Sequence, residues 1–390
     1  MKILFITSEL PYPVHKNGFS LVNYRLLTKA INGVEIDLIS IDKENKESEQ
    51  MLKKESSSLK NIFVVKKSET KFGKLVNLIS VYFWGRPLIK NQYLHRIFMQ
   101  LLKKNNYDLI YACPLTMISE LAYIKNLPPI FLNAIDSYSM LCESFYEKEK
   151  NIKNKLKIHL YKAYEKKLLE QASCVNFVSS VDAKHIGKFS NHQNIQNITL
   201  GIDTSMFFQN PTVEKESGSL LFSGNFEYKP NADTAKYIAE KLFPVINTNG
   251  LNTKLYIVGR NPPQFKTNSN IFITGFVENI AEWYNRCEVF ICPLLYGAGI
   301  KNKVLEAMAC GIPVISSSVG ISGIKGLIHG VHFLLADSKE EQISAIDKLL
   351  NNIELRNKIS DNALRLIKEN YNWDKNISLY YKILTELIQK

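Results

Sequence analysis

Short apolar runs alternate with longer amphipathic stretches along most of the chain. The runs are rich in Ile, Leu, Val and Phe, as expected of buried strands, and the stretches between them carry apolar residues at helical spacing. This alternation predicts parallel sheets with helices on both faces. The predicted strands are 2–7, 34–41, 62–65, 109–111, 130–132, 174–178, 197–200, 219–223, 255–258, 271–274, 289–292 and 314–315.

The stretch from 289 to 317 contains a complete strand–loop–helix–strand unit. A strand ending at Cys292 is followed by Gly297 and Gly299, then by a helix over 303–309 and a second strand. In such units ligands bind at the carboxyl ends of the strands. Glycine lets backbone N–H groups approach a ligand closely, and the dipole of the following helix favours an anion. The pattern therefore predicts an anion site at this turn.

Charged side chains lie at the start of the same helix. Lys301 and Lys303 add positive charge, and Glu306 follows one turn later, where its carboxylate can accept hydrogen bonds from sugar hydroxyls. An ordinary crossover with a solvated pair of lysines explains the pattern equally well. Motif logic alone leaves both interpretations open.

The composition is that of a soluble globular protein. Of 390 residues, 45% are hydrophobic and 22% charged, and the length favours two domains. No apolar run reaches the ~18 residues of a membrane span, and residues 1–10 are typical of a first buried strand rather than a signal peptide. The six cysteines show no metal-type spacing, and we expect reduced core residues of a cytosolic protein. No Ser-His-Asp order, Walker loop or metal cluster is visible, so neither cofactor nor metal is expected.

The net charge of +12 is concentrated in the first half of the chain. One group of lysines lies in 53–74, ahead of the aromatic residues 82–84, and a second lies in 148–167 on a predicted helix. An anionic membrane surface and phosphorylated substrates both fit such basic, partly apolar segments, and so does a plain solvated face. Nucleic acid fits least, because no zinc-finger, RNP or helix-turn-helix pattern is present.

Residues 305–314, Leu-Glu-Ala-Met-Ala-Cys-Gly-Ile-Pro-Val, resemble the donor-binding signature of the retaining glycosyltransferases of family four. Residues 299–307 resemble a subgroup of that family with the motif Gly-Ile-x-Asn-Lys-Val-Leu-Glu-Ala. The second Glu of the family's usual pair falls on Glu306, whereas the first falls on Ala298 and is absent. The resemblance covers nearly the whole chain and is most specific over 299–314.

The resemblance implies an α/β fold of the GT-B type, with two doubly wound Rossmann-like domains that face an interdomain cleft. It places an N-terminal acceptor-side domain at 1–200 and a linker at 201–218. A C-terminal nucleotide-sugar domain follows at 219–370, and a C-terminal helix at 371–390 crosses back to the first domain.

The resemblance also implies roles for single residues. Glu306 would bind the nucleotide ribose, and cations and N–H groups would bind the diphosphate. Asp136 follows a strand end near the reacting centre, although a helix N-cap explains it as well. In the loop before Gly18, Asn17 is a further candidate, and His15 is either a surface histidine or a group acting on the acceptor. The expected catalytic residues are Asp136 and Lys301, and the expected donor-binding residues are Gly18, Gly224, Lys229, Gly259, Val277, Gly299, Ile300, Asn302, Lys303 and Glu306.

The implied reaction is transfer of a hexosyl group from a nucleotide sugar to a glycan or lipid-linked glycan, with retention, in bacterial surface polysaccharide synthesis. The expected location is the cytoplasm, with peripheral contact to the inner face of the membrane. Two alternatives stay open: a nucleotide-sugar epimerase on the same fold, and a non-catalytic nucleotide-sugar-binding module, which Ala298 favours. The sequence does not determine the donor base and sugar, the acceptor and linkage, or the oligomeric state.

Overall fold

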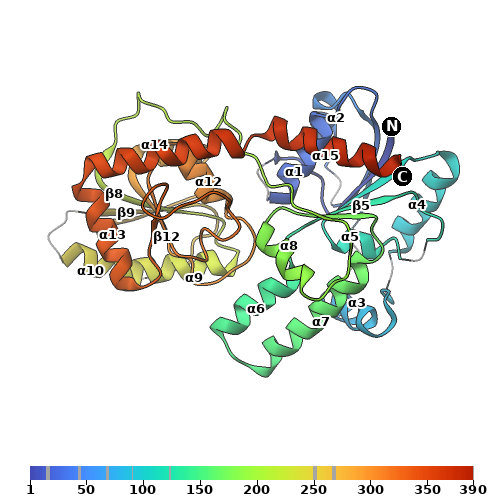
Figure 1. Cartoon of the computed structure of the whole chain (residues 1–390), viewed down its shortest axis with the longest axis horizontal. Helices are drawn as coiled ribbons and strands as arrows, with labels where there is room; N and C mark the ends of the chain where they lie inside the picture. Colours follow the sequence, from blue (N-terminus) through green and yellow to red (C-terminus); the bar gives the residue numbers. More distant parts are fainter. Residues whose placement is uncertain are drawn as a thin grey trace. The chain divides into compact units, whose positions relative to one another are not determined.

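The computed structural model describes residues 1–14, 18–42, 45–66, 70–89, 91–122, 124–248, 253–265 and 269–389. The chain forms two compact units (Figure 1). Unit 1 comprises Met1–Leu200 together with Trp373–Lys390, and unit 2 comprises Gly201–Asn372. His15 and Asn17, which the sequence marked as candidates, lie outside the described residues.

Unit 1 is built on a parallel seven-stranded sheet with the order β3-β2-β1-β4-β5-β6-β7. Its interior strand β1 is apolar on both faces, and Ile3 to Ile6 are buried, because helices cover the sheet on both sides. The strands are β1 (Lys2–Thr7), β2 (Glu35–Ile41), β3 (Leu59–Val65), β4 (Leu109–Cys113), β5 (Ile130–Ile135), β6 (Cys174–Phe177) and β7 (Ile195–Gln196).

The helices of unit 1 include one from the far end of the sequence, α15. Its Tyr380 hydroxyl accepts a hydrogen bond from Asn176 at 2.9 Å, and its Tyr381 hydroxyl donates to the carbonyl of Leu26 at 2.7 Å. The helices are α1 (Gly18–Thr28), α2 (Lys46–Glu55), α3 (Lys71–Trp84), α4 (Gln92–Lys104), α5 (Thr116–Ser119), α6 (Tyr138–Lys148), α7 (Ile152–Leu169), α8 (Ser180–Gly187) and α15 (Trp373–Ile388).

Unit 2 contains a parallel six-stranded sheet with the order β10-β9-β8-β11-β12-β13. Its strands are β8 (Glu216–Ser223), β9 (Lys254–Val258), β10 (Ile271–Gly275), β11 (Cys287–Cys292), β12 (Val314–Ser316) and β13 (Leu334–Leu335). Its helices are α9 (Lys229–Tyr237), the π-helical turn η2 (Ile238–Leu242), α10 (Phe243–Thr248), α11 (Ile280–Arg286), α12 (Asn302–Ala309), α13 (Lys339–Asn351) and α14 (Ile353–Asn370).

Two segments differ from the sequence prediction. The strand predicted at 197–200 is wrong, because β7 occupies Ile195–Gln196 and the N–H of Ile198 donates instead to the side chain of Asn176 at 2.7 Å. The stretch expected as a linker at 201–218 belongs to unit 2. Its Ile202 and Phe207 are buried in the core of that unit, and β8 begins at Glu216.

Within the described part of the chain, no helix is both long enough and apolar enough to cross a membrane.

Candidate functional site

The strand order in the sheet of unit 2 reverses between β8 and β11. Strands β9 and β10 lie beyond β8, whereas β12 and β13 lie beyond β11. Parallel α/β sheets bind ligands outside the carboxyl ends of the strands at such a point. Here those ends are Ser223 and Cys292, and each is followed by a glycine-containing loop.

Two glycines meet at this edge. A Cβ on Gly259 would lie 1.9 Å from the carbonyl oxygen of Gly224. A Cβ on Gly224 would lie 2.8 Å from Nδ2 of Asn231 and 3.1 Å from Nζ of Lys303. The two turns can approach each other this closely because Gly259 has no side chain, and the absence of a side chain on Gly224 leaves room for Asn231 and Lys303.

Lys303 places an ammonium group beside Gly224. It lies in the first turn of α12, where its Nζ donates to Oδ1 of Asn231 at 2.6 Å and stands 4.5 Å from the ring centre of Phe222. Burial lowers the pKa of Lys303 to about 8, since water cannot solvate the charge. An anion bound here would stabilise the charged form of the Lys303 ammonium.

Glu306 lies one turn further along α12. Its Oε2 accepts a hydrogen bond from the hydroxyl of Tyr284 at 3.2 Å, and that hydroxyl is 2.8 Å from Oγ of Ser223. Burial raises the pKa of Glu306 to about 7, although Tyr284 and Lys303 oppose the shift. Near neutral pH the carboxyl is therefore divided between its charged and neutral forms, and in the charged form it accepts hydrogen bonds from hydroxyl groups.

Lys301 lies in the loop before α12 and points back into it. Its buried Nζ donates to the carbonyl oxygens of Ala298, at 2.9 Å, and Gly299, at 2.5 Å. Gly299 has a φ of 73°, a left-handed conformation that glycine adopts without strain. Lys301 therefore holds the loop in shape, and its ammonium is directed to backbone carbonyls.

Asn302 begins α12 with its Oδ1 buried and without a hydrogen-bond partner among the described residues. Ile300 packs against the core of unit 2, as does Val277 after β10. Lys229 is exposed at the first position of α9. The structure thus brings Gly224, Gly259, Lys303 and Glu306 into one cluster.

In unit 1, Asp136 directly follows β5, and Gly18 is the first residue of α1. The residue before Asp136, Ile135, has a φ of 71°, which is unusual for a β-branched side chain. Ser137, and not Asp136, is the N-cap of α6, with its Oγ accepting from the N–H of Met140 at 3.2 Å.

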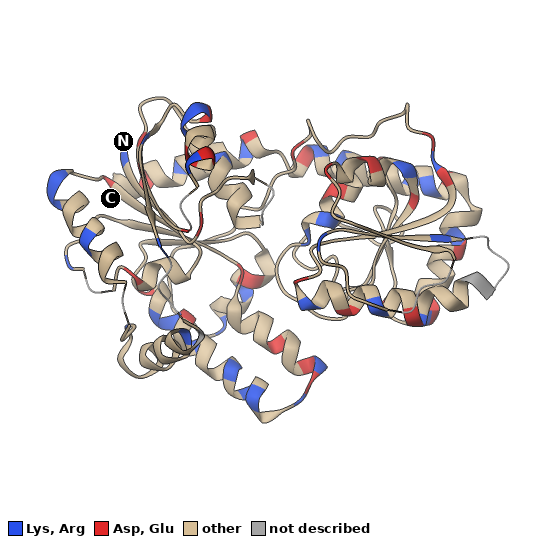
Figure 2. Cartoon of the chain, turned by 180° about the vertical axis from the view of Figure 1, so that it is seen from behind, with Lys and Arg blue, Asp and Glu red and all other residues tan. Residues whose placement is uncertain are grey.

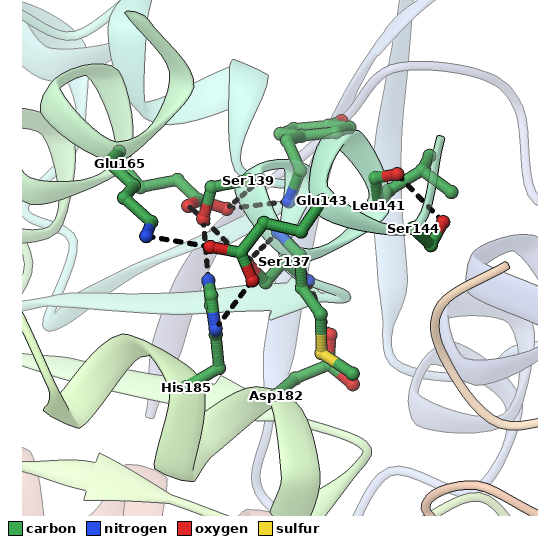
Figure 3. A network of polar contacts seen from close by, with 11 residues as sticks. Ser137, Ser139, Leu141, Glu143, Ser144, Glu165, Asp182 and His185 are labelled. Carbon is green, nitrogen blue, oxygen red and sulfur yellow. Dashed lines mark hydrogen bonds and ion pairs between the residues drawn. The ribbon is translucent and has the colours of Figure 1, made fainter. Parts of the chain in front are cut away.

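Two buried carboxylates hold the turn that carries Asp136 (Figure 3). Oδ1 of Asp182 accepts from the N–H of Ser137 at 2.8 Å. Oε1 of Glu165 accepts from the N–H groups of Tyr138 at 2.6 Å and Ser139 at 3.3 Å. Burial raises the pKa of Glu165 to about 7 against the effect of these hydrogen bonds. Hydrogen bonds from these N–H groups to the two carboxyl side chains therefore hold the first turn of α6 in place.

Ser139, His185 and Glu143 lie in an order that resembles a hydrolytic triad. Nε2 of His185 is 2.9 Å from Oγ of Ser139, and Nδ1 of His185 is 3.5 Å from Glu143. However, Ser139 is completely buried and its hydroxyl donates to Glu165 (Figure 3). No substrate reaches this hydroxyl, so the arrangement is structural.

A cavity of about 260 Å³ lies at the same edge of the unit 1 sheet. Ser8 after β1 and Tyr138 after β5 line it, together with polar and aromatic side chains and the apolar side chains of Ile41, Leu78 and Met117. The lining includes Lys74, Asn77, Ile89, Asn91, Thr116, Ser119, Glu120, Tyr161 and Tyr164. Hydroxyl, amide and aromatic groups together suit a carbohydrate.

Sequence reasoning missed the partners of the main site residues. Tyr284 is fully buried, and its hydroxyl binds Glu306. The contact of Asn231 with Lys303 joins residues 72 positions apart. No local pattern signals such long-range partners.

Comparisons with known proteins agree with this geometry. Residues 217–352 match the family described as glycosyl transferases group 1. An uncharacterized glycosyltransferase of Methanocaldococcus jannaschii is 33% identical over 130 residues, which are 31% of this chain and 32% of that relative. The chain thus spans about a third of the length of this relative. An uncharacterized 44.6 kDa protein in the cps region of Klebsiella pneumoniae is 22% identical over 405 residues, with coverage of 98% and 99%.

Solved structures resemble the whole chain. Sucrose-phosphate synthase from Thermosynechococcus elongatus superposes with a TM-score of 0.73 at 15% identity over 100% of both chains. Anabaena HepE in complex with UDP-glucose gives 0.63 at 14% identity, over 99% of this chain and 100% of that one. WaaG, a glycosyltransferase involved in lipopolysaccharide biosynthesis, gives 0.64 at 16% identity, over 97% and 99%.

At these identities the structures establish the fold, and the predicted GT-B class is confirmed. Residues 217–352 are a glycosyl transferases group 1 domain within a chain of GT-B fold, and together the comparisons support a glycosyltransferase.

Proposed function

We propose that this protein is a retaining glycosyltransferase that moves a hexosyl group from a nucleotide sugar to a glycan or lipid-linked glycan in surface polysaccharide synthesis. The observation that carries the proposal is the cluster at the β8–β11 edge. There the ammonium of Lys303 adjoins the Gly224–Gly259 contact, and Glu306 lies one turn away on the same helix.

In this proposal the donor diphosphate lies over Gly224 and against Lys303, with the N–H of Gly299 and the N-terminus of α12 adding positive potential. Asn302 begins α12 with an amide oxygen that has no protein partner among the described residues, so a donor hydroxyl can donate to it. Glu306 accepts hydrogen bonds from the ribose. Lys229, Gly259, Ile300 and Val277 complete the donor-binding set.

The leaving group gains negative charge as the bond from the sugar to the diphosphate breaks. Lys303 and the α12 N–H groups face that charge and therefore lower the barrier. The departing phosphate oxygen takes the proton from the acceptor hydroxyl on the same face of the sugar, which retains the anomeric configuration. Lys301 acts through the shape of the 297–301 loop, and Asp136 and Gly18 of unit 1 stay predictions.

The relatives support a choice of donor and acceptor class. HepE was solved with UDP-glucose, WaaG acts in lipopolysaccharide biosynthesis, and the Klebsiella pneumoniae relative is encoded in a cps region. We therefore propose a UDP-sugar donor and a glycan acceptor on the cytoplasmic face of the membrane, with peripheral contact between the protein and anionic lipid.

A thermal-shift screen with a panel of nucleotide sugars tests the donor site, because a ligand that binds only the folded state raises the melting temperature. We expect a UDP-sugar to stabilise the protein and Glu306→Ala to abolish the shift. Lys54→Ala, on the exposed face of α2, should leave it unchanged. A panel without any stabilising nucleotide would contradict the proposal.

A non-catalytic binding module is the second candidate, because Ala298 stands where the family's first Glu is expected. Labelled donor incubated with bacterial membranes separates the two. Transfer of label into the lipid extract supports the enzyme. Tight donor binding with neither transfer nor hydrolysis supports the module.

A further inference from the structure

Unit 1 carries an apolar surface centred on α3. Large hydrophobic side chains are exposed along this helix and the segment after it. We define the α3 surface as Phe72, Leu75, Ile79, Tyr82, Phe83, Trp84, Leu88, Ile89 and Tyr93. Phe83 and Trp84 are each 64% exposed. Contiguous apolar patches of this kind on a folded protein mark a contact with a partner or a membrane.

The α3 surface is held in place by specific contacts. The side chain of Asn77 binds both the N–H and the carbonyl of Ile89 at 2.8 Å, and Oγ of Ser80 accepts from the N–H of Leu88 at 3.0 Å. On the opposite face of α3, Leu78 and Val81 are buried in the core. The exposed apolar side chains are therefore fixed in their outward positions by the fold.

A lysine of a neighbouring helix contacts the backbone of this surface. Helix α7 packs against α3, and Nζ of Lys167 donates to the carbonyl of Tyr82. Glu165, the acidic residue of α7, is buried, and Figure 2 colours the Lys and Arg residues of the chain blue. One lysine of α7, Lys162, pairs with Glu143 of α6 at 2.6 Å. The lysines of α7 are Lys153, Lys155, Lys157, Lys162, Lys166 and Lys167. Near an anionic bilayer such charges are attracted to the headgroups.

The cavity of unit 1 described above opens at the edge of the α3 surface. Ile89 lines the cavity and is also exposed on the surface, and Lys74 and Asn77 of α3 form part of the cavity wall. The cavity extends to Tyr138, two residues beyond Asp136. An acceptor with its lipid in a bilayer could therefore place its polar end in the cavity.

We infer that the α3 surface docks unit 1 onto an anionic lipid bilayer, with its apolar side chains among the acyl chains and the α7 lysines on the headgroups. This inference rests on the proposed function and names the place where the acceptor is presented. A second copy of the chain fits less well, because a contact between two such surfaces would bring lysines against lysines. A bilayer with anionic headgroups satisfies both the apolar and the cationic parts.

Flotation of the full chain with vesicles tests the inference. We expect binding to phosphatidylcholine vesicles that contain about one-third phosphatidylglycerol, weaker binding to phosphatidylcholine alone, and a decrease at high salt. Phe72→Ser with Phe83→Ser should reduce the bound fraction at least tenfold. Ile353→Ser, at a site 62% exposed in unit 2, is the matched control and should change nothing.

The charged part of the surface has its own control pair. Lys153→Gln with Lys157→Gln should reduce binding several-fold only when phosphatidylglycerol is present. Lys348→Gln with Lys368→Gln, both exposed in unit 2, should not. Trp84 reports insertion directly: lipids brominated in the acyl chain should quench its fluorescence, and Trp84→Phe should remove the quenching.

The inference is overturned if vesicles fail to bind at low salt, or if the α3 surface variants instead abolish self-association. The same samples are tested for a thermal shift with UDP. A shift that persists without vesicle binding overturns only the docking surface, whereas vesicle binding without a shift overturns only the donor site.

Discussion

Lys303 combines a depressed pKa with a position where the proposed diphosphate binds. Burial brings its pKa to about 8, so the free protein loses this charge as the pH rises past 8. A bound diphosphate stabilises the ammonium and raises its pKa again. Binding therefore takes up a proton near pH 8, and affinity must fall as the pH rises above that value.

We predict that UDP binds several-fold more weakly at pH 9 than at pH 8. Calorimetry in two buffers of different ionisation enthalpy should detect the proton uptake. Lys303→Met should weaken binding at pH 7.5 and remove both the uptake and the pH dependence. Lys236→Met, exposed on α9, serves as the control. Equal proton uptake in the Lys303 variant would contradict this role.

Glu165 is a buried carboxyl whose pKa is raised from 4.5 to about 7. Because its folded pKa exceeds its unfolded pKa, the folded state binds the proton more tightly. Its contribution to stability is fully present below pH 4.5 and is lost as the pH rises through 7. His185, Glu143, Lys162 and Asp182 lie beside the same network.

We predict that Glu165→Gln flattens this dependence. Glutamine keeps the acceptor for the N–H of Tyr138 but adds no buried charge. Relative to Glu165→Gln, the wild type should lose roughly 1–3 kcal/mol of stability between pH 5 and pH 8. Thermal denaturation over this range measures the difference. Exposed Glu170→Gln should follow the wild type, and a parallel curve for Glu165→Gln would refute the assignment.

At the level of elements, the donor edge depends on how closely the turns after β8 and β9 approach. Gly259→Ala would put a Cβ 1.9 Å from the backbone of Gly224, where no flexible side chain can yield. We predict a loss of more than about 2 kcal/mol in the stability of unit 2 and loss of UDP binding. Gly187→Ala on α8, where a Cβ meets nothing within 4 Å, should be neutral or slightly stabilising. Differential scanning calorimetry distinguishes the two.

Local sequence patterns predicted most strands correctly, because a short apolar run between two helical stretches fits few structures other than a buried strand. β1 lies at Lys2–Thr7 as predicted, and β11 and β12 enclose the predicted glycine turn. The strand predicted at 197–200 does not form, because the N–H of Ile198 donates to the side chain of Asn176 on a neighbouring strand. A hydrogen bond from the backbone to a side chain, in place of one between strands, cannot be recognised in a pattern of hydrophobic residues.

The candidate site, too, could be predicted only in part from the sequence. A contiguous motif placed Lys303 and Glu306 on one helix, and the structure has both on α12. Its charge states depend on burial and on Tyr284, Ser223 and Asn231, which come from other elements. Desolvation is a property of the assembled fold, so the pKa values could not be predicted from residue types alone.

At the scale of the whole molecule, unit 1 is discontinuous in sequence. Helix α15 supplies buried Trp373, Tyr380, Tyr381, Leu384 and Leu387 to a unit otherwise formed by Met1–Leu200. Burying each large apolar side chain stabilises a fold by roughly 1.5–3 kcal/mol. Together they are comparable with the entire ~5–15 kcal/mol stability of a typical domain.

We predict that truncation after Asn372 unfolds unit 1 and leaves unit 2 folded. Calorimetry should show one lost transition and one retained, and the retained one should still respond to UDP. Leu379→Ser, on the exposed side of α15, is the control and should keep both transitions. Two intact transitions after truncation would show that α15 is dispensable.

The same helix has a consequence for synthesis in the cell. The ribosome makes residues 1–200 first, yet these residues cannot complete their core until the whole of unit 2 has emerged and α15 follows it. Unit 2 is contiguous and can fold as soon as it clears the exit tunnel. Nascent chains therefore pass through a stage in which the later half is native and the earlier half is open along the groove that Tyr380 will fill. That stage is where chaperones and proteases would meet this protein.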